Sequence, residues 1–431
     1  MSDTERQSLQ KGASQKAASQ QGAVTPGTLI KDRDFRRIWI AGSLGWMMRW
    51  LELLAVGVFT FEVTGSALMV ALMTMVRMLP MLLFSAFTGA IADSLDRRLM
   101  LLWGLGTLAV VSAILTVLSL TGHLELWHVA AGAFASGIYM TLEFPVRRTM
   151  LGIIAGAKAG TGGAGMAMTL DSGSNHCMRL IGPIVGGLLL EAHGLPGVYI
   201  LGTVMFAIGF VMVLGARYEA PAQTGSGSGS RILAQIIEGF SYIRTNPRIM
   251  STLFITVALN LCGFPYGAMV PVIGDQVLGQ SATATGMLIS ADAAGALLGV
   301  IVIANLARPR HYARLYLYGS IIFLCMVFAF SLSYWYPASL GLLFLAGLGV
   351  SGFAAMQSTI VFTSAPPEMR GRMMGVVAIC IGTGPIGVLQ VGLLADWFGG
   401  AMSVSIITVE GLVALLVAAL IWPHLYRRQP V

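Results

Sequence analysis

Charged residues are scarce in this chain of 431 residues. Asp, Glu, Lys and Arg account for 10% of it and hydrophobic residues for 56%, whereas ordinary soluble domains carry about 25% charged residues. This composition excludes a soluble globular protein and indicates a chain that crosses a membrane several times. The formal net charge of +7 does not indicate a nucleic-acid partner, because basic residues at membrane borders give the same excess.

Residues that build metal sites and catalytic centres are also few. The four cysteines, Cys177, Cys262, Cys325 and Cys380, lie in apolar stretches without the paired spacing of a metal site or a disulfide framework. His176 has no second histidine at ligand spacing, so we expect a structural histidine. The sequence contains no Gly-x4-Gly-Lys-Ser/Thr loop and no arrangement of nucleophile, base and orienting group. We therefore expect neither an ATP-driven pump nor an enzyme, and no metal or cofactor.

Apolar stretches of about 20 residues, the length that crosses a bilayer as a helix, occur twelve times. They divide into two sets of six, which predicts an all-α membrane protein with two six-helix bundles, at 38–217 and 249–422. Tails at 1–37 and 423–431 and a linker at 218–248 complete the chain. The predicted spans are 38–61, 67–91, 99–120, 126–141, 165–190, 198–216, 249–273, 282–306, 315–332, 338–363, 373–395 and 404–422.

The basic residues alternate between the two ends of these spans. Of the 26 Lys and Arg, all but three lie in the tails and in the even-numbered connections, and the odd-numbered connections contain none. Arg49, Arg77 and Arg179 lie inside spans. The positive-inside rule therefore places both termini in the cytoplasm. The expected location is a bacterial-type cytoplasmic membrane.

The connection between the two sets of spans has its own pattern. Thr224 is followed by alternating glycine and serine to Ser230, and such a composition is typical of a flexible linker. Ile232, Ile236, Phe240 and Ile243 then recur at helical spacing and predict an amphipathic helix. It would either lie along the cytoplasmic membrane surface or pack on the other cytoplasmic connections.

The stretch from Gly89 to Arg98 is where a long apolar run first gives way to charge, and we expect a tight turn of ten residues there. Gly89, Asp93, Arg97 and Arg98 fill the places of a Gly, Asp and basic-pair signature, although Asp96 stands where a glycine is common. The pattern resembles the loop between helices 2 and 3 of the major facilitator superfamily. The resemblance implies a cytoplasmic gate, to which we add two basic residues of a later connection, Arg370 and Arg372.

Further segments are similar to a narrower branch of that superfamily, the enterobactin-exporter-like and macrolide-efflux-like members. These segments are Phe144 to Arg148, Arg179 to Pro183, and Asn260 to Pro271. The resemblance implies a twelve-helix fold and export of a small amphipathic molecule, siderophore-like or drug-like. Gly182 to Gly187 also resembles the end of a helix 5 motif of antiporters, and its small residues serve either close packing or exchange.

Six ionisable residues stand out inside the predicted spans, where each costs several kcal/mol without a partner. Three are positive and three negative, so we expect them to neutralise each other in pairs. They are either structural ion pairs, or one carboxyl exchanges a proton as the cavity alternates between sides. Glu52 and Asp292 are the leading proton-coupling candidates, and Asp171 is the third. The six are Arg49, Glu52, Arg77, Asp171, Arg179 and Asp292.

Two other acidic residues in or near spans have weaker claims. Glu143 lies close to Arg147 and Arg148 near the end of the fourth span, and we assign it to that basic region. Glu410 lies in the twelfth span, which is peripheral in the superfamily, so we expect it to have a structural partner.

The seventh span contains a proline between two glycines, which predicts a bent helix beside a cavity. This places Asn260, Phe264 and Tyr266 on the cavity wall. By resemblance to the superfamily the other lining residues are Trp46, Met47, Trp50, Tyr139 and Gln357.

The functional hypothesis is proton-coupled export by alternating access. Its expected partners are a small-molecule substrate, protons and the lipid bilayer, and the expected state is a monomer. Two alternatives stay open: a lipid or lysolipid flippase of the same fold, and a membrane receptor that keeps the fold without transport.

Overall fold

The computed structural model describes residues 26–218, 242–244, 246–306, 309–366 and 369–427, with the backbone alone at 85–94, 158–162, 304–306, 309 and 371. All regular elements in these ranges are helices. Two are short 3-10 turns, η1 (Pro309–His311) and η3 (Pro423–Leu425). The α-helices are α2 (Pro26–Lys31), α3 (Arg33–Thr64), α4 (Ala67–Ser94), α5 (Arg97–Leu120), α6 (Leu126–Gly215), α8 (Pro247–Cys262), α9 (Tyr266–Gln276), α10 (Ala282–Leu306), α11 (Tyr312–Ser331), α12 (Tyr336–Ser364), α13 (Arg370–Ile381), α14 (Gly384–Phe398) and α15 (Gly400–Ile421).

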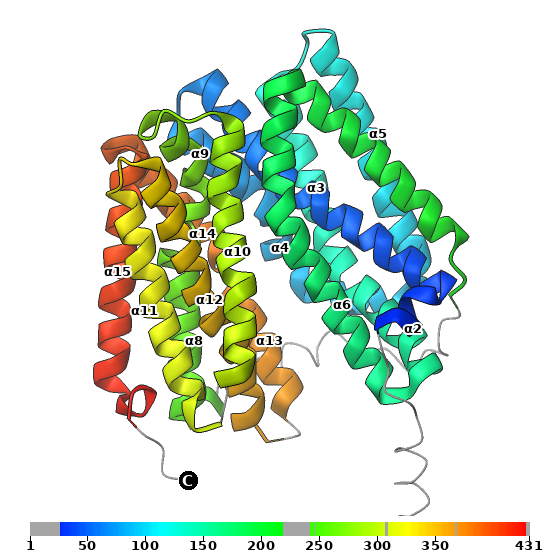
Figure 1. Cartoon of the computed structure of the whole chain (residues 1–431). Helices are drawn as coiled ribbons and strands as arrows, with labels where there is room; N and C mark the ends of the chain where they lie inside the picture. The colour runs from blue at the N-terminus through cyan, green and yellow to red at the C-terminus, as the bar shows by residue number, and fades with distance from the viewer. Residues whose placement is uncertain (1–25, 219–241, 245, 307–308, 367–368, 428–431) are drawn as a thin grey trace, which may run out of the picture.

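Eleven helical segments of the described chain are long and apolar enough to cross a membrane. One of them, Gly163–Gly215, has 53 residues, whereas a crossing takes about 20. Inside it Gly194 has a φ of 63°, a left-handed conformation that glycine adopts without a steric penalty. The chain reverses direction there, between the predicted spans 165–190 and 198–216 (Figure 1). The multi-span helical fold is confirmed, and the count of twelve crossings stays a prediction.

The helices form two halves, with α3 to α6 on one side and α8 to α15 on the other (Figure 1). The first half packs around buried residues such as Met48, Leu51 and Leu105. The second packs around Tyr316, Phe323 and Phe330. Its core also includes residues on either side of the α3–α4 turn, namely Phe61, Ala67, Val70 and Ala71. The halves are therefore in contact at the end where this turn lies.

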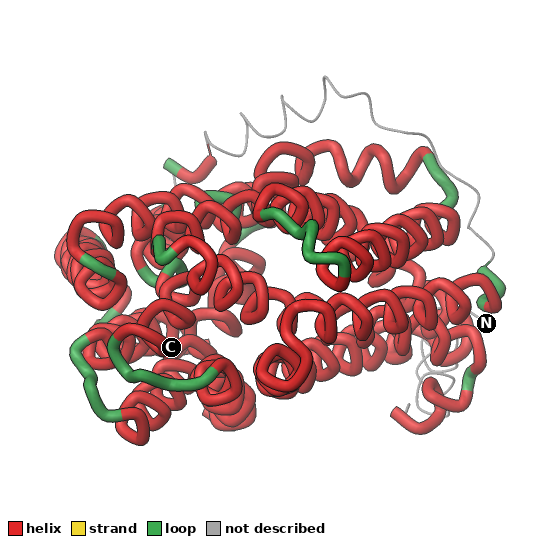
Figure 2. Tube along the Cα trace, turned by 90° about the horizontal axis from the view of Figure 1, so that it is seen from above, coloured by secondary structure: helices red, strands yellow, loops and turns green. Residues whose placement is uncertain are grey.

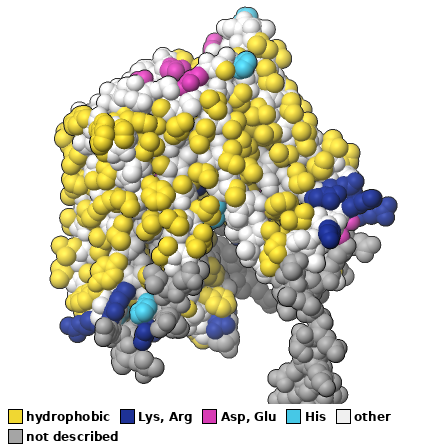
Figure 3. Space-filling model, in the orientation of Figure 1, with side chains coloured by type: hydrophobic (Ala, Val, Ile, Leu, Met, Phe, Trp, Pro, Cys, Tyr) yellow, Lys and Arg dark blue, Asp and Glu magenta, His cyan; other side chains and the backbone are white. Residues whose placement is uncertain are grey.

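The two ends of the molecule differ in charge. Lys and Arg side chains gather at what we call the basic end, in the lower part of Figure 3, and most of the visible acidic side chains lie at the opposite end. Figure 3 also shows a hollow between the halves that opens toward the basic end, whereas the opposite end is closed. Two arginines cap the C-terminal end of α6: Arg98 donates to the carbonyl oxygens of Leu214 and Val213 at 2.5 and 3.3 Å, and Arg37 donates to that of Gly215.

The bend predicted in the seventh span is confirmed, because α8 ends at Cys262 and α9 begins at Tyr266. A second break, between α13 and α14, is not foreseen in the predicted span 373–395. The two breaks are neighbours: a Cβ on Gly387 of α14 would meet the carbonyl oxygens of Asn260 and Leu261 and the ring of Pro265. Two discontinuous helices thus pack together in the second half.

The prediction of a ten-residue turn from Gly89 to Arg98 is wrong. Helix α4 continues to Ser94, and only Leu95 and Asp96 separate it from α5. The residue that departs from the family signature explains the tight connection, since Asp96 is the N-cap of α5. Its Oδ1 accepts hydrogen bonds from the backbone N–H of Arg98 and Leu99 at 2.8 and 3.3 Å.

Two connections predicted from the sequence remain to be compared with the structure: the one at 142–164 and the linker between the two halves. The predicted connection at 142–164 is helical, because α6 runs through it from Leu126. The predicted linker at 224–230 lies outside the described residues, as does the amphipathic helix after it apart from Tyr242 to Arg244.

Candidate functional site

One ion pair joins the two halves at the depth of the helix centres. An Nη2 hydrogen of Arg179 in α6 is donated to Oδ2 of Asp292 in α10. The Asp292 side chain is 3% exposed and that of Arg179 is 22% exposed. The Arg179 guanidinium also lies 5.2 Å from the ring centroid of Trp50 in α3. This pair can persist only while the halves stay together at this level.

Small residues allow the two helices of this pair to approach closely. A Cβ on Gly286 of α10 would meet the Pro183 carbonyl of α6, and one on Gly187 would meet the Thr283 backbone. Nearer the opposite end, Glu191 Oε1 accepts a hydrogen bond of 2.7 Å from the backbone N–H of Thr283. Pro183 and Gly187 therefore serve close packing between the halves, whereas Gly182 and Gly186 pack on α3 within the first half. Close packing is one of the two roles left open above.

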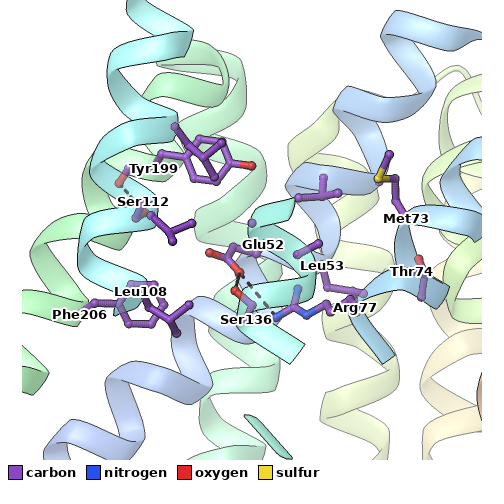
Figure 4. A pocket seen from close by; sticks show the side chains of 16 residues that line it. Glu52, Leu53, Met73, Thr74, Arg77, Leu108, Ser112, Ser136, Tyr199 and Phe206 are labelled. Atoms are coloured by element: carbon purple, nitrogen blue, oxygen red, sulfur yellow. Dashed lines mark hydrogen bonds and ion pairs between the residues drawn. The ribbon is translucent and has the colours of Figure 1, made fainter. Parts of the chain in front are cut away.

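A second ion pair lies inside the first half. Arg77 Nη2 of α4 is 3.7 Å from Glu52 Oε2 of α3, and the Ser136 hydroxyl lies 3.3 Å from the same oxygen. The side chains of Glu52 and Arg77 are 10% and 11% exposed. Figure 4 shows the carboxylate pointing toward both partners.

The Glu52 carboxylate borders a small cavity between helices of the first half. Its polar lining residues include Ser112, Ser136 and Tyr199 (Figure 4), and the Ser112 hydroxyl donates to the Tyr199 carbonyl at 3.0 Å. The centre of a water molecule can occupy about 20 Å³ of it, which is room for one or two waters. The cavity can hydrate Glu52 but cannot hold a drug-sized molecule.

The third carboxylate, Asp171, has partners that the sequence prediction did not assign to it. Arg147 donates hydrogen bonds from Nε to Glu143 and from Nη1 to Asp171, and Arg148 Nε lies 2.9 Å from Asp171 Oδ2. The side chains of Arg147 and Asp171 are 2% and 1% exposed, and Gly42 leaves the space that Arg147 fills. The expectation that Asp171 pairs with one of the three arginines inside the spans is wrong, because the longer helix α6 brings Arg147 and Arg148 to its level.

Arg49 is the remaining member of the predicted set of six. Among the described residues it has no carboxylate within ion-pair distance, and Glu52 on the same helix pairs with Arg77 instead. The Arg49 guanidinium lies 5.3 Å from the ring centroid of Trp46 and 5.6 Å from that of Trp50. The prediction that all six charges pair with one another is therefore wrong for Arg49.

The predicted cavity-lining residues fall into two groups. Trp46 and Trp50 surround Arg49, with Met47 and Tyr139 buried in the first half. In the second half, Gln357 donates to the Thr256 hydroxyl at 2.9 Å and Asn260 to the Thr256 carbonyl at 2.8 Å. None of the predicted lining residues borders the cavity at Glu52, and their role in lining a substrate cavity stays a prediction.

Sequence reasoning missed two members of the polar network around Gln357. Tyr316 of α11 lies with its hydroxyl 3.0 Å from that of Thr256 and donates to the Thr252 carbonyl at 2.9 Å. Its ring stacks on Phe353 with centroids 5.3 Å apart. Two of the predicted lining residues contact the Phe323 ring: the centroid distance is 5.5 Å for Phe264 and 5.8 Å for Tyr266. The available signal in the sequence was a pair of threonines at helical spacing, Thr252 and Thr256. Apolar spans contain many threonines, so this signal does not single out the network.

The arginines predicted to form a gate lie at the basic end. Arg97 and Arg98 contact the end of α6, and Arg370 and Arg372 contact residues beside the start of α13. The side chain of Asp93 lies outside the described residues, as does any contact of Gly89, so the gate stays a prediction. The contacts are Arg97 to the Tyr218 hydroxyl at 3.2 Å, Arg370 to the Phe362 ring at 4.5 Å and to the Ala365 carbonyl at 3.4 Å, and Arg372 to Met369 Sδ at 3.3 Å.

Glu410 and His176 were the weaker candidates for a functional role. Glu410 in α15 accepts a hydrogen bond of 2.6 Å from Gln390 in α14, which gives it the structural partner that we expected. His176 has a buried Nδ1 without a hydrogen-bond partner. Within the described residues, no group of three or more His, Cys, Asp or Glu could hold a metal ion.

Comparison with known proteins decides the family. The family of transmembrane secretion effectors matches residues 25–428, nearly the whole chain. This chain belongs to that family, a branch of the major facilitator superfamily. The resemblance noted from the sequence is thereby confirmed, and the protein is a membrane transporter rather than an enzyme.

Individual relatives agree with this assignment. The transporter is 22% identical to the staphyloferrin A transporter of Staphylococcus aureus over 367 residues, covering 84% of this chain and 89% of that protein. It is 21% identical to macrolide efflux protein A of Streptococcus pyogenes, covering 85% and 90%. Among solved structures, the inward-facing, unoccupied bacterial homologue of the human lysosomal transporter Spinster superposes with a TM-score of 0.71 at 13% identity, covering 93% of this chain and all of that one.

The paired arginines of α6 provide a matched test of burial. Replacement of Arg147 by Gln leaves Glu143 and Asp171 buried without their shared cation, so we expect the free energy of unfolding to fall by about 3 kcal/mol or more. Arg148→Gln removes a cation that is 32% exposed, and its expected cost is below about 1 kcal/mol. Denaturant titration of both variants in the same detergent measures the difference. Equal losses would show that burial does not set the strength of this cluster.

Proposed function

We propose that this transporter is a proton-coupled exporter of a small amphipathic molecule and works by alternating access. The observation that carries the proposal is the Arg179–Asp292 ion pair, because it joins the halves at the centre of the molecule. In transporters built from two similar halves, rocking of the halves around a central site is the usual way to move a substrate. A conformation in which the halves part at this level separates the two charges.

Separation of the pair links the conformation to a proton. A carboxylate beside an arginine holds its charge, whereas a carboxylate left in an apolar environment without its partner takes up a proton instead. Asp292 therefore alternates between an ion-paired state and a protonated state as the halves move. Glu52 keeps its partner Arg77 within one half, so rocking of the halves does not separate it. Of these two proton-coupling candidates, Asp292 therefore fits the role better than Glu52.

The relatives support the direction and the kind of substrate. One relative is named as a macrolide efflux protein, and another is named as a transporter of the siderophore staphyloferrin A. The chain carries no phosphate-binding loop of the Gly-x4-Gly-Lys-Ser/Thr type, which favours an ion gradient as the energy source. We therefore propose export of siderophore-like or drug-like molecules.

The charge distribution supports an orientation in the membrane. Arginines gather at the basic end, and the positive-inside rule assigns such an end to the cytoplasm. We propose that the transporter is a monomer in the cytoplasmic membrane, with both termini and the linker between the six-helix bundles on the cytoplasmic side. The hollow then faces the cytoplasm, as in the inward-facing neighbour.

Replacement of Asp292 by Asn tests the coupling. The amide cannot carry a proton, so transport driven by a pH gradient should be lost while exchange of substrate at equal pH continues. Proteoliposomes are first screened with siderophores, macrolides and lysolipids, and a compound moved by the wild-type protein is then used for the variants. Glu52→Gln is the matched control, and it should keep most gradient-driven transport.

Two results would contradict this assignment. Gradient-driven transport that survives in Asp292→Asn would move the proton to another group or remove coupling altogether. Movement of lysolipids alone in the screen would instead favour the flippase function.

Labelling of single cysteines tests the orientation, in a background with the four native cysteines replaced. His123 lies in the α5–α6 turn at the opposite end, and Arg310 lies in η1 at the basic end. We expect a membrane-impermeant maleimide to label His123→Cys in intact cells and to label Arg310→Cys only after the membrane is opened. The reverse pattern would invert the proposed topology.

A further inference from the structure

Arg49 stands apart from the other charges of the first half. It lies in the middle of α3 and is half-buried. Arg77, Glu143 and Arg179 are near enough for their charges to act on it. Within the described chain, however, no carboxylate lies within ion-pair distance of its guanidinium. An arginine at bilayer depth without a counter-charge is unfavourable by several kcal/mol, which requires an explanation.

The neighbouring carboxylates are already engaged. Glu52 has Arg77, Glu143 and Asp171 share Arg147 and Arg148, and Asp292 has Arg179. Four acidic side chains thus face five arginines in this part of the structure, and Arg49 is the excess cation. The pairs are Arg77–Glu52, Arg147–Glu143, Arg147–Asp171, Arg148–Asp171 and Arg179–Asp292.

Hydrogen-bond donors without acceptors lie in the same place. Trp46, which is 6% exposed, has an indole N–H that is buried and has no partner. The Nε–H of Arg179 is also buried and without a partner. Both groups can only donate, and so can a guanidinium. A buried donor that lacks an acceptor is costly, so these two buried donors beside the Arg49 guanidinium indicate that an acceptor occupies this place at some stage.

Aromatic rings complete the surroundings of Arg49. Its guanidinium lies over the rings of Trp46 and Trp50, and that of Arg179 lies over Trp50 on the same helix. The Trp50 indole N–H donates to Asn175 at 3.1 Å, which fixes the ring. Fixed indole faces offer apolar contact area beside the positive charge.

We propose that Arg49, with Trp46 and Trp50, binds a carboxylate group of the transported molecule. This inference rests on the proposed function and narrows it to amphipathic substrates that carry a carboxylate. The guanidinium fork matches the two oxygens of a carboxylate and provides its charge-assisted hydrogen bonds. The indole rings contact the apolar part of the same molecule. The bound carboxylate is the counter-charge that Arg49 otherwise lacks.

Quenching of tryptophan fluorescence tests the proposal directly, because two tryptophans form the site. The probe is 4-iodobenzoate, whose iodine quenches a nearby indole, and 4-iodobenzamide is its neutral control. Binding is measured on the whole transporter in lipid nanodiscs without a gradient. We expect saturable quenching by the carboxylate and none by the amide. Arg49→Gln should weaken carboxylate binding about 10- to 100-fold, the range for a charged hydrogen bond, and Arg49→Lys should retain part of the affinity.

Arg314→Gln is the control for a loss of positive charge away from the site. It should bind 4-iodobenzoate like the wild-type protein, since Arg314 lies at the basic end, where its Nε donates to the Tyr426 carbonyl at 3.1 Å. Equal affinity of the wild-type protein and Arg49→Gln would overturn the proposal. So would equal saturable binding of the amide and the carboxylate by the wild-type protein, a result that does not depend on whether any variant folds.

This experiment is independent of transport. If the carboxylate binds through Arg49 but no compound is moved in proteoliposomes, the proposed transport function fails and the binding site stands. If transport is found and Arg49→Gln binds the carboxylate normally, the binding site fails and the transport function stands.

Discussion

A charged side chain inside a bilayer needs a counter-charge or hydrogen bonds, because the hydrocarbon layer supplies neither. In this transporter the constraint brings distant helices together. The Glu52–Arg77 pair joins α3 to α4, the Arg147 and Arg148 cluster is internal to α6, and Arg179–Asp292 joins α6 to α10 in the other half. The first two hold one half in shape. The third depends on the position of one half relative to the other.

The packing between the halves makes the third pair sensitive to their movement. Gly187 and Gly286 let α6 and α10 touch at backbone level, so a slight separation removes many contacts together, as expected where close-packed helices part. In the second half, the breaks between α8 and α9 and between α13 and α14 lie side by side. Interrupted helices at bilayer depth are tolerated where they border a cavity. The transporter thus combines a separable ion pair between its halves with two interrupted helices in the second half.

Much of the fold follows from the sequence because membrane spans are local features. The predicted span 282–306 coincides with α10, and the proline between two glycines foretells the interruption after Cys262. Errors arise where a local rule meets an exception. Asp96 replaces the usual glycine of the signature and, as an N-cap, shortens the expected turn to two residues. The helix of the fourth span continues past its apolar part, which moves Arg147 and Arg148 into the protein.

The site is less predictable than the fold because its partners are far apart in the chain. Arg179 and Asp292 are 113 residues apart, and spacing cannot say which of three arginines meets which carboxylate. Helical spacing does place Arg49 and Glu52 on one face, but Ser136 and Arg77 engage the carboxylate from other helices. Only the three-dimensional packing shows that Arg49 is left over.

The central claim is that the Arg179–Asp292 pair favours the state in which the halves are closed at the opposite end. A distance measurement between spin labels tests it most directly, with labels at Leu120→Cys in the first half and Tyr334→Cys in the second, both at that end and well exposed. We predict one short-distance population in the otherwise unaltered transporter and an added longer one when Asp292 is replaced by Asn or Arg179 by Gln. Glu410→Gln, which alters a carboxyl away from this contact, should leave the distances unchanged. The same distances with and without the Arg179–Asp292 pair would contradict the account.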